Sequence, residues 1–532
     1  MKKHYVLSDQ NNKKCGVSTI TTDEYNMKIL FLCLLFMLFA IKAYEQSPLK
    51  PFPQHVTYTA GTIKPINYTQ SQLDNSVKAF YNQWKEIYLK NNCGASQYYV
   101  WFDESSANNS ICVSEGQGYG MLITAYMAGY DANAKIYFDG LYNFYKAHPS
   151  VNNNKLMAWN QITGCIDDPD GGNNSATDGD EDIAFALLLA DKQWGSTGAI
   201  NYMEEALAII NALKQDDVNQ ALWIPILGDW VTPGSYEYDD TRPSDFMMDH
   251  FRAFQNAAGD ADWNNMLNEC YTLINTIQTN YSPSSGLLPD FIVNVNSLPA
   301  PAAPNYLEGD FDGDYYYNAC RTPLRIGADY LISGDIRAKN AVQKINNWIR
   351  AKTGNDPSNI YAGYYLNGND IPGNDYESAA FAGPFAVAAM VDVSNQNWLN
   401  DTYDFLLSLE LQDYEYYDNT LKLLCMLVLS GNYWVPQGVP GNMNDSYSKN
   451  FKVDVYPNPF NSSITVSISN LNGSSVTLLI DDVIGQTLYN TKENISGNTF
   501  SKTIDLNCLS GGMYYLMAII EGEQTGIKIL KK

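Results

Sequence analysis

Between about residues 72 and 432, hydrophobic positions recur with the period of an α-helix, in stretches separated by loops rich in Gly, Asn, Asp, Pro and Tyr. We count twelve such stretches and find no self-similarity at a fixed period, which an α-solenoid would show. Twelve helices in one large domain fit a toroid of six helical hairpins, whose loops can build a cleft at one end. We expect helices over residues 76–90, 120–130, 134–148, 182–194, 200–214, 245–258, 261–278, 322–333, 336–352, 376–391, 396–410 and 421–431.

The pattern changes after residue 434. Residues 435–451 have the Pro-, Gly-, Asn- and Ser-rich composition of a linker. Short runs that alternate apolar and polar positions follow, among them FKVDVYPNPF, SSITVSIS and GGMYYLMAIIEG. We therefore predict a helical domain over residues 48–434 and a small all-β domain over residues 452–532.

The N-terminal region reads as an export signal. The stretch MKILFLCLLFMLFAIKAYEQ, which begins at Met27, has a short basic start, an apolar run and Ala43 where cleavage can occur. A membrane anchor is the alternative, but the run is shorter than that of a good spanning helix, so we expect no stable membrane span in the mature chain. We predict a signal peptide over residues 27–43 and a non-native extension over residues 1–26.

Charge and histidine content narrow the function classes. The formal charge of −25 argues against a nucleic-acid partner, which needs a basic face, whereas an acidic surface suits either a polycationic ligand or plain solubility. The four histidines are too scattered for a zinc site, and we expect neither metal nor cofactor. Export exposes the cysteines to oxidation, and Cys93 and Cys112 are close enough in sequence to pair.

Three acidic segments carry the candidate chemistry. SEGQGYGM places Glu115 among three glycines, which predicts either a ligand-facing turn or a helix start with Ser114 as its N-cap. ATDGDEDIAFALLLADKQW crowds acids at the start of an apolar helix, and YLEGDFDGDYYYNACR combines acids with tyrosines. The last segment could suggest calcium, but it lacks the register of an EF-hand. Separated carboxylates in aromatic, glycine-containing loops suit glycoside hydrolysis, in which one carboxyl group protonates the leaving oxygen and another activates water.

Residues from about 60 to 434 resemble glycoside hydrolase family 8. SEGQGYGM resembles the segment with the general acid, which implies that role for Glu115, and ATDGDEDIAFALLLADKQW resembles the family signature, with Asp178 as the substrate-orienting aspartate. FAGPFAVAAM and YEYYDNTLKLL resemble later segments. The resemblance implies an all-α (α/α)6 barrel and an inverting mechanism.

One position departs from the pattern of the cellulase and xylanase branch. There the base is an aspartate in YDAxR, but this chain has YNACR, with Asn318 in its place. The branch with chitosanases and lichenases has an asparagine there and uses a glutamate in the preceding loop, which resembles Glu308. We therefore expect Glu308 to be the base. A catalytically decayed glycan-binding protein is the alternative that Asn318 leaves open.

The resemblance implies a secreted endo-β-1,4-glycanase that acts on a polysaccharide. We rank chitosan first as substrate, because the branch resemblance points to it and an acid-rich cleft would attract a polyglucosamine. Mixed-linkage β-glucan is second and cellulose third. Arg321 and Arg325 either neutralise the acids near residue 310 or position the base. The candidate substrate contacts are Trp101, Tyr119, Trp159, Trp230, Tyr317, Asn318 and Arg321.

Residues 452–532 resemble the type A C-terminal sorting domain of the type IX secretion system, from VYPNPF through DVIGQTLY to GMYYL and the basic end KILKK. A carbohydrate-binding module is the rival, but the strands show no row of exposed tryptophans. The resemblance implies the secretion machinery as a partner and a secreted or cell-surface location. We expect the protein to be a monomer.

Overall fold

A computed structural model describes residues 47–102, 109–412, 415–436, 452–469, 475–481, 487–495, 497–520 and 523–532. The expected extension and signal peptide lie outside the described residues, as does the linker after residue 436. The described chain divides into two compact units. One holds the residues up to Phe246 together with Ile274–Trp434, and the other holds Met247–Leu273 together with the residues after Trp434.

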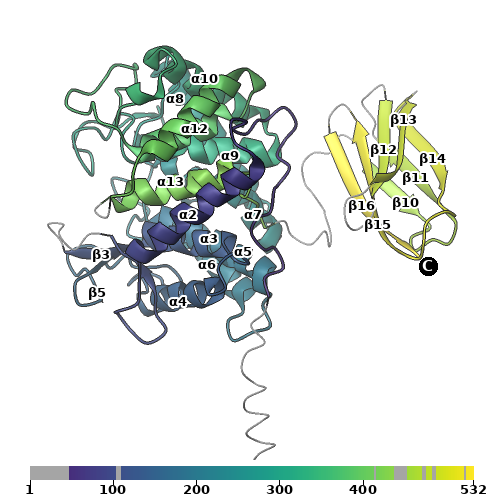
Figure 1. Ribbon diagram of the computed structural model, residues 1–532, viewed down its shortest axis with the longest axis horizontal. Helices are drawn as coiled ribbons and strands as arrows, with labels where there is room; N and C mark the ends of the chain where they lie inside the picture. Colours follow the sequence, from purple (N-terminus) through teal and green to yellow (C-terminus); the bar gives the residue numbers. More distant parts are fainter. Residues whose placement is uncertain are drawn as a thin grey trace, which may run out of the picture. The chain divides into compact units, whose positions relative to one another are not determined.

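The described residues form twelve α-helices, as the hydrophobic pattern predicts (Figure 1). They are α2 (Gln70–Tyr88), α3 (Ser114–Tyr126), α4 (Ala134–Ala147), α5 (Thr177–Trp194), α6 (Tyr202–Asp216), α7 (Met248–Ala258), α8 (Asp262–Asn280), α9 (Thr322–Ser333), α10 (Ile336–Thr353), α11 (Ala379–Ala389), α12 (Gln396–Ser408) and α13 (Tyr416–Leu429). None of the helices in the described part of the chain is both long enough and apolar enough to cross a bilayer.

The helices of the first unit form an inner and an outer set. In α3, α5, α9, α11 and α13 almost every residue is buried, whereas α2, α4, α6, α10 and α12 bury one face only. Within the inner set, α3 contacts α5 and α13, and α11 contacts α9 and α13. Each outer helix packs on an inner helix next to it along the chain, except that α2 packs on α13 and so joins the two ends of the domain.

Glycines let α3 and α5 approach each other closely. A Cβ on Gly118 would lie 2.7 Å from the Cβ of Asp182, and one on Gly179 would lie 2.4 Å from the Oγ of Ser114. Neither glycine has a positive φ, so both serve helix packing. Of the two predicted alternatives for SEGQGYGM, the structure shows the helix start and not a turn, although Glu115 faces the cleft. Ser114 is also the first residue of α3, and its N-cap is Val113, not Ser114.

Short strands frame the helix ends. They are β1 (Leu89–Lys90), β2 (Tyr99–Val100), β3 (Ser110–Val113), β4 (Asn160–Ile162), β5 (Ile166–Asp167), β6 (Val218–Asn219), β7 (Ile224–Pro225), β8 (Ile292–Val293) and β9 (Ala300–Pro301). A disulfide joins Cys93 to Cys165, beside β5. Cys112 is a buried free thiol, so the expected pairing of Cys93 with Cys112 is wrong: sequence proximity does not reveal that the β3–β4–β5 sheet brings Cys165 nearer.

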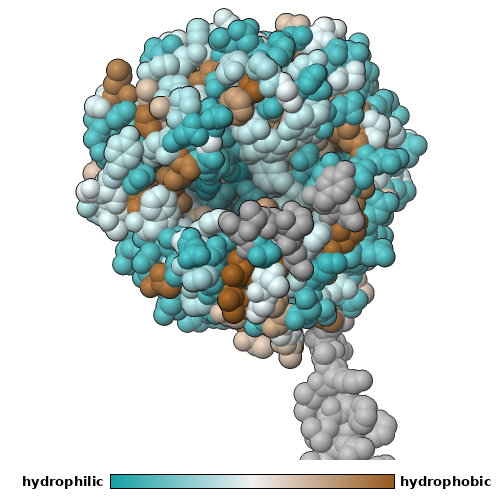
Figure 2. All heavy atoms as spheres, turned by 90° about the vertical axis from the view of Figure 1, so that its left-hand side faces the viewer, coloured by the Kyte–Doolittle hydropathy of each residue, from teal (hydrophilic) through white to brown (hydrophobic). Residues whose placement is uncertain are grey.

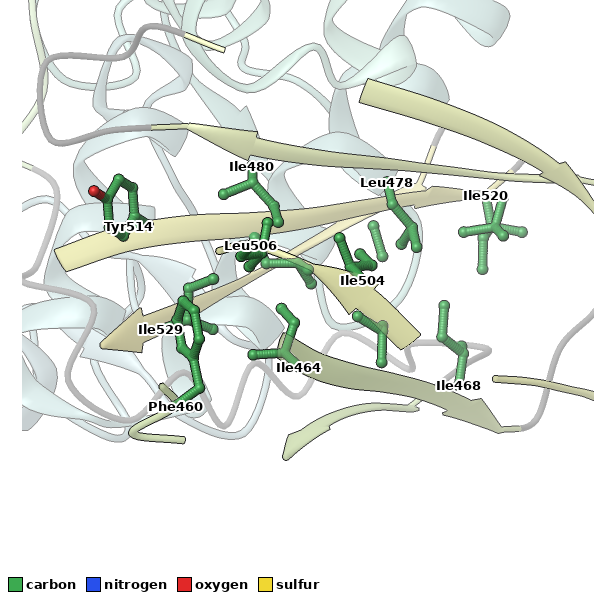
Figure 3. Packing of buried hydrophobic residues seen from close by; sticks show 14 residues of the cluster. Phe460, Ile464, Ile468, Leu478, Ile480, Ile504, Leu506, Tyr514, Ile520 and Ile529 are labelled. Carbon is green, nitrogen blue, oxygen red and sulfur yellow. The ribbon is translucent and has the colours of Figure 1, made fainter. Parts of the chain in front are cut away.

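The C-terminal domain is a sandwich of two antiparallel sheets. Its strands are β10 (Lys452–Tyr456), β11 (Ser463–Ser469), β12 (Ser475–Asp481), β13 (Thr487–Asn494), β14 (Thr499–Asp505), β15 (Gly512–Ile520) and β16 (Glu523–Lys531). The sheets have the orders β10–β11–β14 and β13–β12–β15–β16. Alternate residues of β11 are buried, and Ile464 and Ile468 pack with Ile480 of the other sheet in one apolar core (Figure 3). The predicted all-β domain is confirmed.

Candidate active site

A cleft of about 820 Å³ opens at the N-terminal ends of α3 and α5. Figure 2 shows a hollow in the face that carries β3 and β5. The loops that follow β5, β7 and β9 supply most of the walls of the cleft. Its lining comprises Phe102, Val113, Ser114, Glu115, Trp159, Gly171, Asn174, Ser175, Ala176, Asp178, Leu227, Trp230, Arg242, Phe291, Leu307, Glu308, Tyr317, Asn318 and Tyr417.

Two carboxylates at the start of neighbouring inner helices share one guanidinium. Nη1 of Arg321 donates to Oε2 of Glu115 at 2.6 Å and to Oδ2 of Asp178 at 2.7 Å. The arginine is 1% exposed and lies in a 3₁₀ turn, Ala319–Arg321, directly before α9. Nη2 of the same group donates to Oγ of Ser244 at 3.0 Å. The floor of the cleft therefore has fixed geometry before any substrate binds.

The shared guanidinium cannot fully compensate both carboxylates, and their pKa values diverge. Burial raises the pKa of Glu115 to about 7, because desolvation and the negative charge of Asp178 outweigh Arg321, Arg242 and the hydroxyl of Tyr416. Tyr416 donates to Oε1 of Glu115 at 3.2 Å. A carboxyl group with this pKa keeps its proton in part of the molecules at neutral pH, as a general acid must.

The pKa of Asp178 is shifted in the opposite direction from that of Glu115. Burial opposes its ionisation, but Arg242 and Arg321 outweigh burial and lower the pKa of Asp178 to about 2. Nη2 of Arg242 lies 3.0 Å from Oδ1 of Asp178, and the backbone N–H of Gly179 donates to the same oxygen at 2.9 Å. Asp178 is therefore a permanent anion on the cleft floor. The other acids of the segment point elsewhere: Asp180 accepts from the N–H of Met157, and Asp182 pairs with Arg325 at 2.6 Å.

Glu308 is the third carboxylate in the lining. Nδ2 of Asn318 donates to its Oε2 at 2.7 Å, and Nη1 of Arg242 lies 3.9 Å from its Oε1. Its side chain is 49% exposed, against 17% for Glu115. Oδ1 of Asn318 accepts from Nη2 of Arg321 at 2.9 Å, so hydrogen bonds run without a break from Glu115 through Arg321 and Asn318 to Glu308.

The acids that follow Glu308 hold the loop together. Asp312 is 2% exposed and accepts from the backbone N–H groups of Leu307, Glu308 and Gly309 at 2.7 to 3.0 Å. Nδ2 of Asn305 donates to Asp310 at 2.7 Å. These carboxylates are therefore used within the protein. In the described part of the chain, no group of three or more His, Cys, Asp or Glu side chains is placed to hold a metal ion.

The structure separates the candidate substrate contacts. Trp159, Trp230, Tyr317 and Asn318 line the cleft. The rest do not. Trp101 stacks on Tyr88, with ring centroids 6.4 Å apart. Tyr119 is fully buried beneath the cleft floor, where its hydroxyl lies 3.4 Å from Nη1 of Arg321. Tyr119 is too deeply buried for the expected substrate contact, and Arg321 supports the carboxylates instead. Trp101 is half-buried outside this lining, and its expected contact stays a prediction.

Two side chains that shape the site have no clear signal in the sequence. Arg242 lies in DDTRPSDF, where the neighbouring acids suggest only local pairing, and it does pair with Asp245 at 3.0 Å. Asp290 stands alone in LPDFIV, yet it accepts from the backbone N–H groups of Tyr316 and Ala319 at 3.1 and 2.7 Å and so holds the turn before Arg321. Burial raises the pKa of Asp290 to about 8.

The comparisons with known proteins match both domains. The description "Glycosyl hydrolases family 8" fits residues 51–431, and "Secretion system C-terminal sorting domain" fits residues 454–532. The sorting domain marks the protein as secreted or exposed at the cell surface.

Several characterised proteins resemble the chain over most of their length. It is 50% identical to a β-glucanase of Niallia circulans over 406 residues, which cover 76% of this chain and 96% of the relative. It is 41% identical to an endoglucanase of Bacillus sp. strain KSM-330, with 73% of this chain and 82% of the relative covered.

Solved structures of two further proteins are also similar to this chain. An apo structure of a β-1,3-1,4-glucanase from Paenibacillus sp. X4 matches with 52% identity and a TM-score of 0.70, covering 73% of this chain and 100% of the other. The structure of Rex8A from Paenibacillus barcinonensis, at 21% identity and a TM-score of 0.60, shares the fold.

Proposed function

Because the chain belongs to glycoside hydrolase family 8 and is a hydrolase of the β-glucanase and endoglucanase type with the (α/α)6 fold, we propose that it cleaves mixed-linkage β-1,3-1,4-glucan with inversion. Glu115 is the general acid, Glu308 the general base and Asp178 the residue that orients the sugar. The observation that carries this proposal is the chain of hydrogen bonds between Glu115 and Glu308, two carboxyl groups in one cleft with different environments.

Glu115 suits the acid because its raised pKa leaves a proton to donate. It sits on the first turn of a buried helix, so its carboxyl group has little freedom to move. As it transfers the proton to the leaving oxygen, it becomes an anion, and the contact with Arg321 at 2.6 Å stabilises that charge. The glutamate therefore meets a positive charge at the moment when its own negative charge develops.

Glu308 suits the base because it is half exposed and can reach a water molecule. An inverting enzyme keeps its two carboxyl groups about 6.5 to 9.5 Å apart to leave room for that water. The amide of Asn318 holds one carboxylate oxygen, which leaves the other facing Arg242 and the cleft. Asn318 cannot take a proton itself, and its role here is to fix the base.

Asp178 suits the orienting role because its lowered pKa of about 2 keeps it ionised at neutral pH. An anion on the floor between two arginines can accept hydrogen bonds from sugar hydroxyls and stabilise positive charge at the reacting carbon. The indole rings of Trp159 and Trp230 line the same cleft and offer flat faces to sugar rings.

The charge of the cleft favours a neutral glucan over chitosan. Its lining carboxylates are Glu115, Asp178 and Glu308, and each has a guanidinium nitrogen within 3.9 Å. No lining carboxylate is thus left to pair with the ammonium group of a glucosamine, and the net charge of −25 is not concentrated here. The names of the relatives point to β-glucan as well. We therefore place mixed-linkage glucan before chitosan and cellulose.

A reducing-sugar assay on lichenan, carboxymethylcellulose and soluble chitosan tests this order. We expect the highest turnover on lichenan and the lowest on chitosan. A higher rate on chitosan would overturn the substrate assignment. Binding of these polymers without any hydrolysis would instead favour a decayed glycan-binding protein.

A further inference from the structure

An exposed aromatic ring stands on the loop that follows Trp230. The side chain of Tyr236 is 81% exposed, the highest value among the exposed large hydrophobic side chains of the described residues. Its ring lies beside that of Tyr306, with centroids 6.2 Å apart and an interplanar angle of 41°. Two neighbouring tyrosines from segments 70 residues apart make a surface that a single loop would not provide.

Three segments hold this pair in place. The hydroxyl of Tyr306 donates to Oδ2 of Asp240 at 2.7 Å, and its ring packs on Phe291 at 5.5 Å. The backbone groups of Thr241 and Ile292 exchange hydrogen bonds of 2.9 and 2.8 Å, which fastens the Tyr236 loop to β8. The position of the pair is thus set by the fold.

The pair continues the apolar wall of the cleft. Leu227 and Phe291 belong to a small buried cluster, against which Trp230 and Tyr306 pack. Of these, Leu227, Trp230 and Phe291 line the cleft. An apolar surface therefore runs from the cleft through Tyr306 to Tyr236, and such a surface at the rim of a binding site is typical of a further contact with the ligand.

We propose that Tyr236 and Tyr306 form an outer subsite that binds a sugar of the β-glucan chain beyond the Trp230 wall of the cleft. The inference rests on the proposed function, because the continuous wall indicates the same polymer as occupant. Flat aromatic faces bind the apolar faces of pyranose rings, while the hydroxyl groups of the sugar remain in water. Only a chain long enough to leave the cleft would reach this subsite.

The test compares long and short substrates in Tyr236→Ala. We expect KM on lichenan to rise roughly three- to tenfold, with kcat and the melting temperature unchanged, because one aromatic contact with the ligand is lost. Kinetics on a mixed-linkage tetrasaccharide should stay as in the wild type. Tyr236→Phe keeps the ring and should behave as the wild type. So should Tyr456→Ala, the matched control, which removes a tyrosine that is 55% exposed in the C-terminal domain.

Binding without turnover separates this inference from the proposed function. In affinity electrophoresis on lichenan, Glu115→Gln should be retarded more strongly than the double variant Glu115→Gln with Tyr236→Ala. Unchanged KM and equal retardation would overturn the outer subsite, as would an equal loss on the tetrasaccharide. A wild type that hydrolyses no β-glucan, but whose binding still depends on Tyr236, would overturn the proposed function and leave the subsite standing. A wild type that neither hydrolyses nor binds lichenan would overturn both the proposed function and the outer subsite.

Discussion

Asn318 donates its side-chain N–H to Glu308 at 2.7 Å and accepts from Arg321 with its carbonyl oxygen at 2.9 Å. Both the nitrogen and the oxygen of the amide are hydrogen-bonded. Glu308 can only accept and Arg321 can only donate, so the two partners cannot be exchanged. An aspartate at this position would have no hydrogen to give to Glu308. The asparagine is therefore matched to the carboxylate of Glu308 in the preceding loop.

Asn318→Asp should impair the enzyme by placing two carboxylates in contact. Like charges this close raise the pKa of one member, so the base would hold a proton in mildly acidic solution. We expect the acid limb of the kcat/KM profile to move to higher pH. Asn318→Ala, which removes the donor without adding charge, should not show that shift. An unchanged profile in Asn318→Asp would contradict the contact described here.

Glu115→Gln should fold normally and lose turnover by roughly 10²- to 10⁴-fold, the usual contribution of a general acid. In the wild type, the acid form of Glu115 is present below its pKa of about 7 and is lost above it, so kcat/KM should fall as pH rises through that value. Tyr416→Phe removes a hydrogen bond that favours the ionised form and should move this limb to higher pH. If the fall of kcat/KM at high pH is the same in Glu115→Gln and in Tyr416→Phe as in the wild type, it reports the titration of another group.

Glu308→Ala should abolish hydrolysis of natural polymers, because no group remains to deprotonate the attacking water. Azide should partly restore the rate, since this anion attacks without losing a proton. Proton NMR of the wild-type reaction should show the α-anomer as first product from a β-glucan. A Glu308→Ala enzyme with near-normal rate would move the base elsewhere, and a first product with the β-anomer would exclude inversion.

Asp178→Asn should reduce both turnover and stability. The anion compensates two buried guanidinium groups, and its neutralisation leaves them underpaired. Because the folded pKa of about 2 lies below the ordinary value of about 3.9, ionised Asp178 stabilises the fold above that value, and this contribution is lost as pH falls through the folded pKa. The melting temperature of the variant should therefore depend less on pH between pH 2 and 7 than that of the wild type. If the melting temperatures of both proteins changed equally with pH, the ionised carboxylate of Asp178 would contribute no net stability.

The disulfide should stabilise the catalytic domain. It links positions 72 residues apart, and a loop of this size corresponds to about 4 kcal/mol in the chain-entropy estimate. Cys93→Ser with Cys165→Ser should lower the melting temperature by several degrees. Cys508→Ser is the matched control, because this cysteine is exposed and unpaired, and it should change nothing.

The sequence was informative wherever local pattern decides structure. Helical periodicity predicted all twelve helices, and alternation predicted the all-β domain, because burial of one face determines the spacing of apolar residues. The segments around Glu115, Asp178 and Glu308 could be singled out as carboxylates in glycine- and tyrosine-rich surroundings. The structure brings these three into one cleft; their roles stay predictions.

Contacts between distant segments could not be predicted. The partner of Cys93 depends on a sheet whose strands lie 50 residues apart, and Arg242 reaches Asp178 across 64 positions. Tyr119 is buried because α3 packs on α5 and α13. The residues around Tyr119 in the sequence give no sign of this packing. The pairing of each lining carboxylate with an arginine is likewise a property of the fold, and it weakens the argument from net charge to chitosan.

The close approach of α3 and α5 at Gly118 and Gly179 has a consequence for how such enzymes diverge. Glu115 and Asp178 belong to a helical floor whose spacing is set by glycines, whereas Glu308 belongs to a loop that is held by side-chain contacts such as those of Asp312 and Tyr306. On the proposed assignment of Glu308 as the base, a lineage can move this role between neighbouring loop positions while the floor stays intact. The double variant Glu308→Ala with Asn318→Asp would retrace such a relocation in one step.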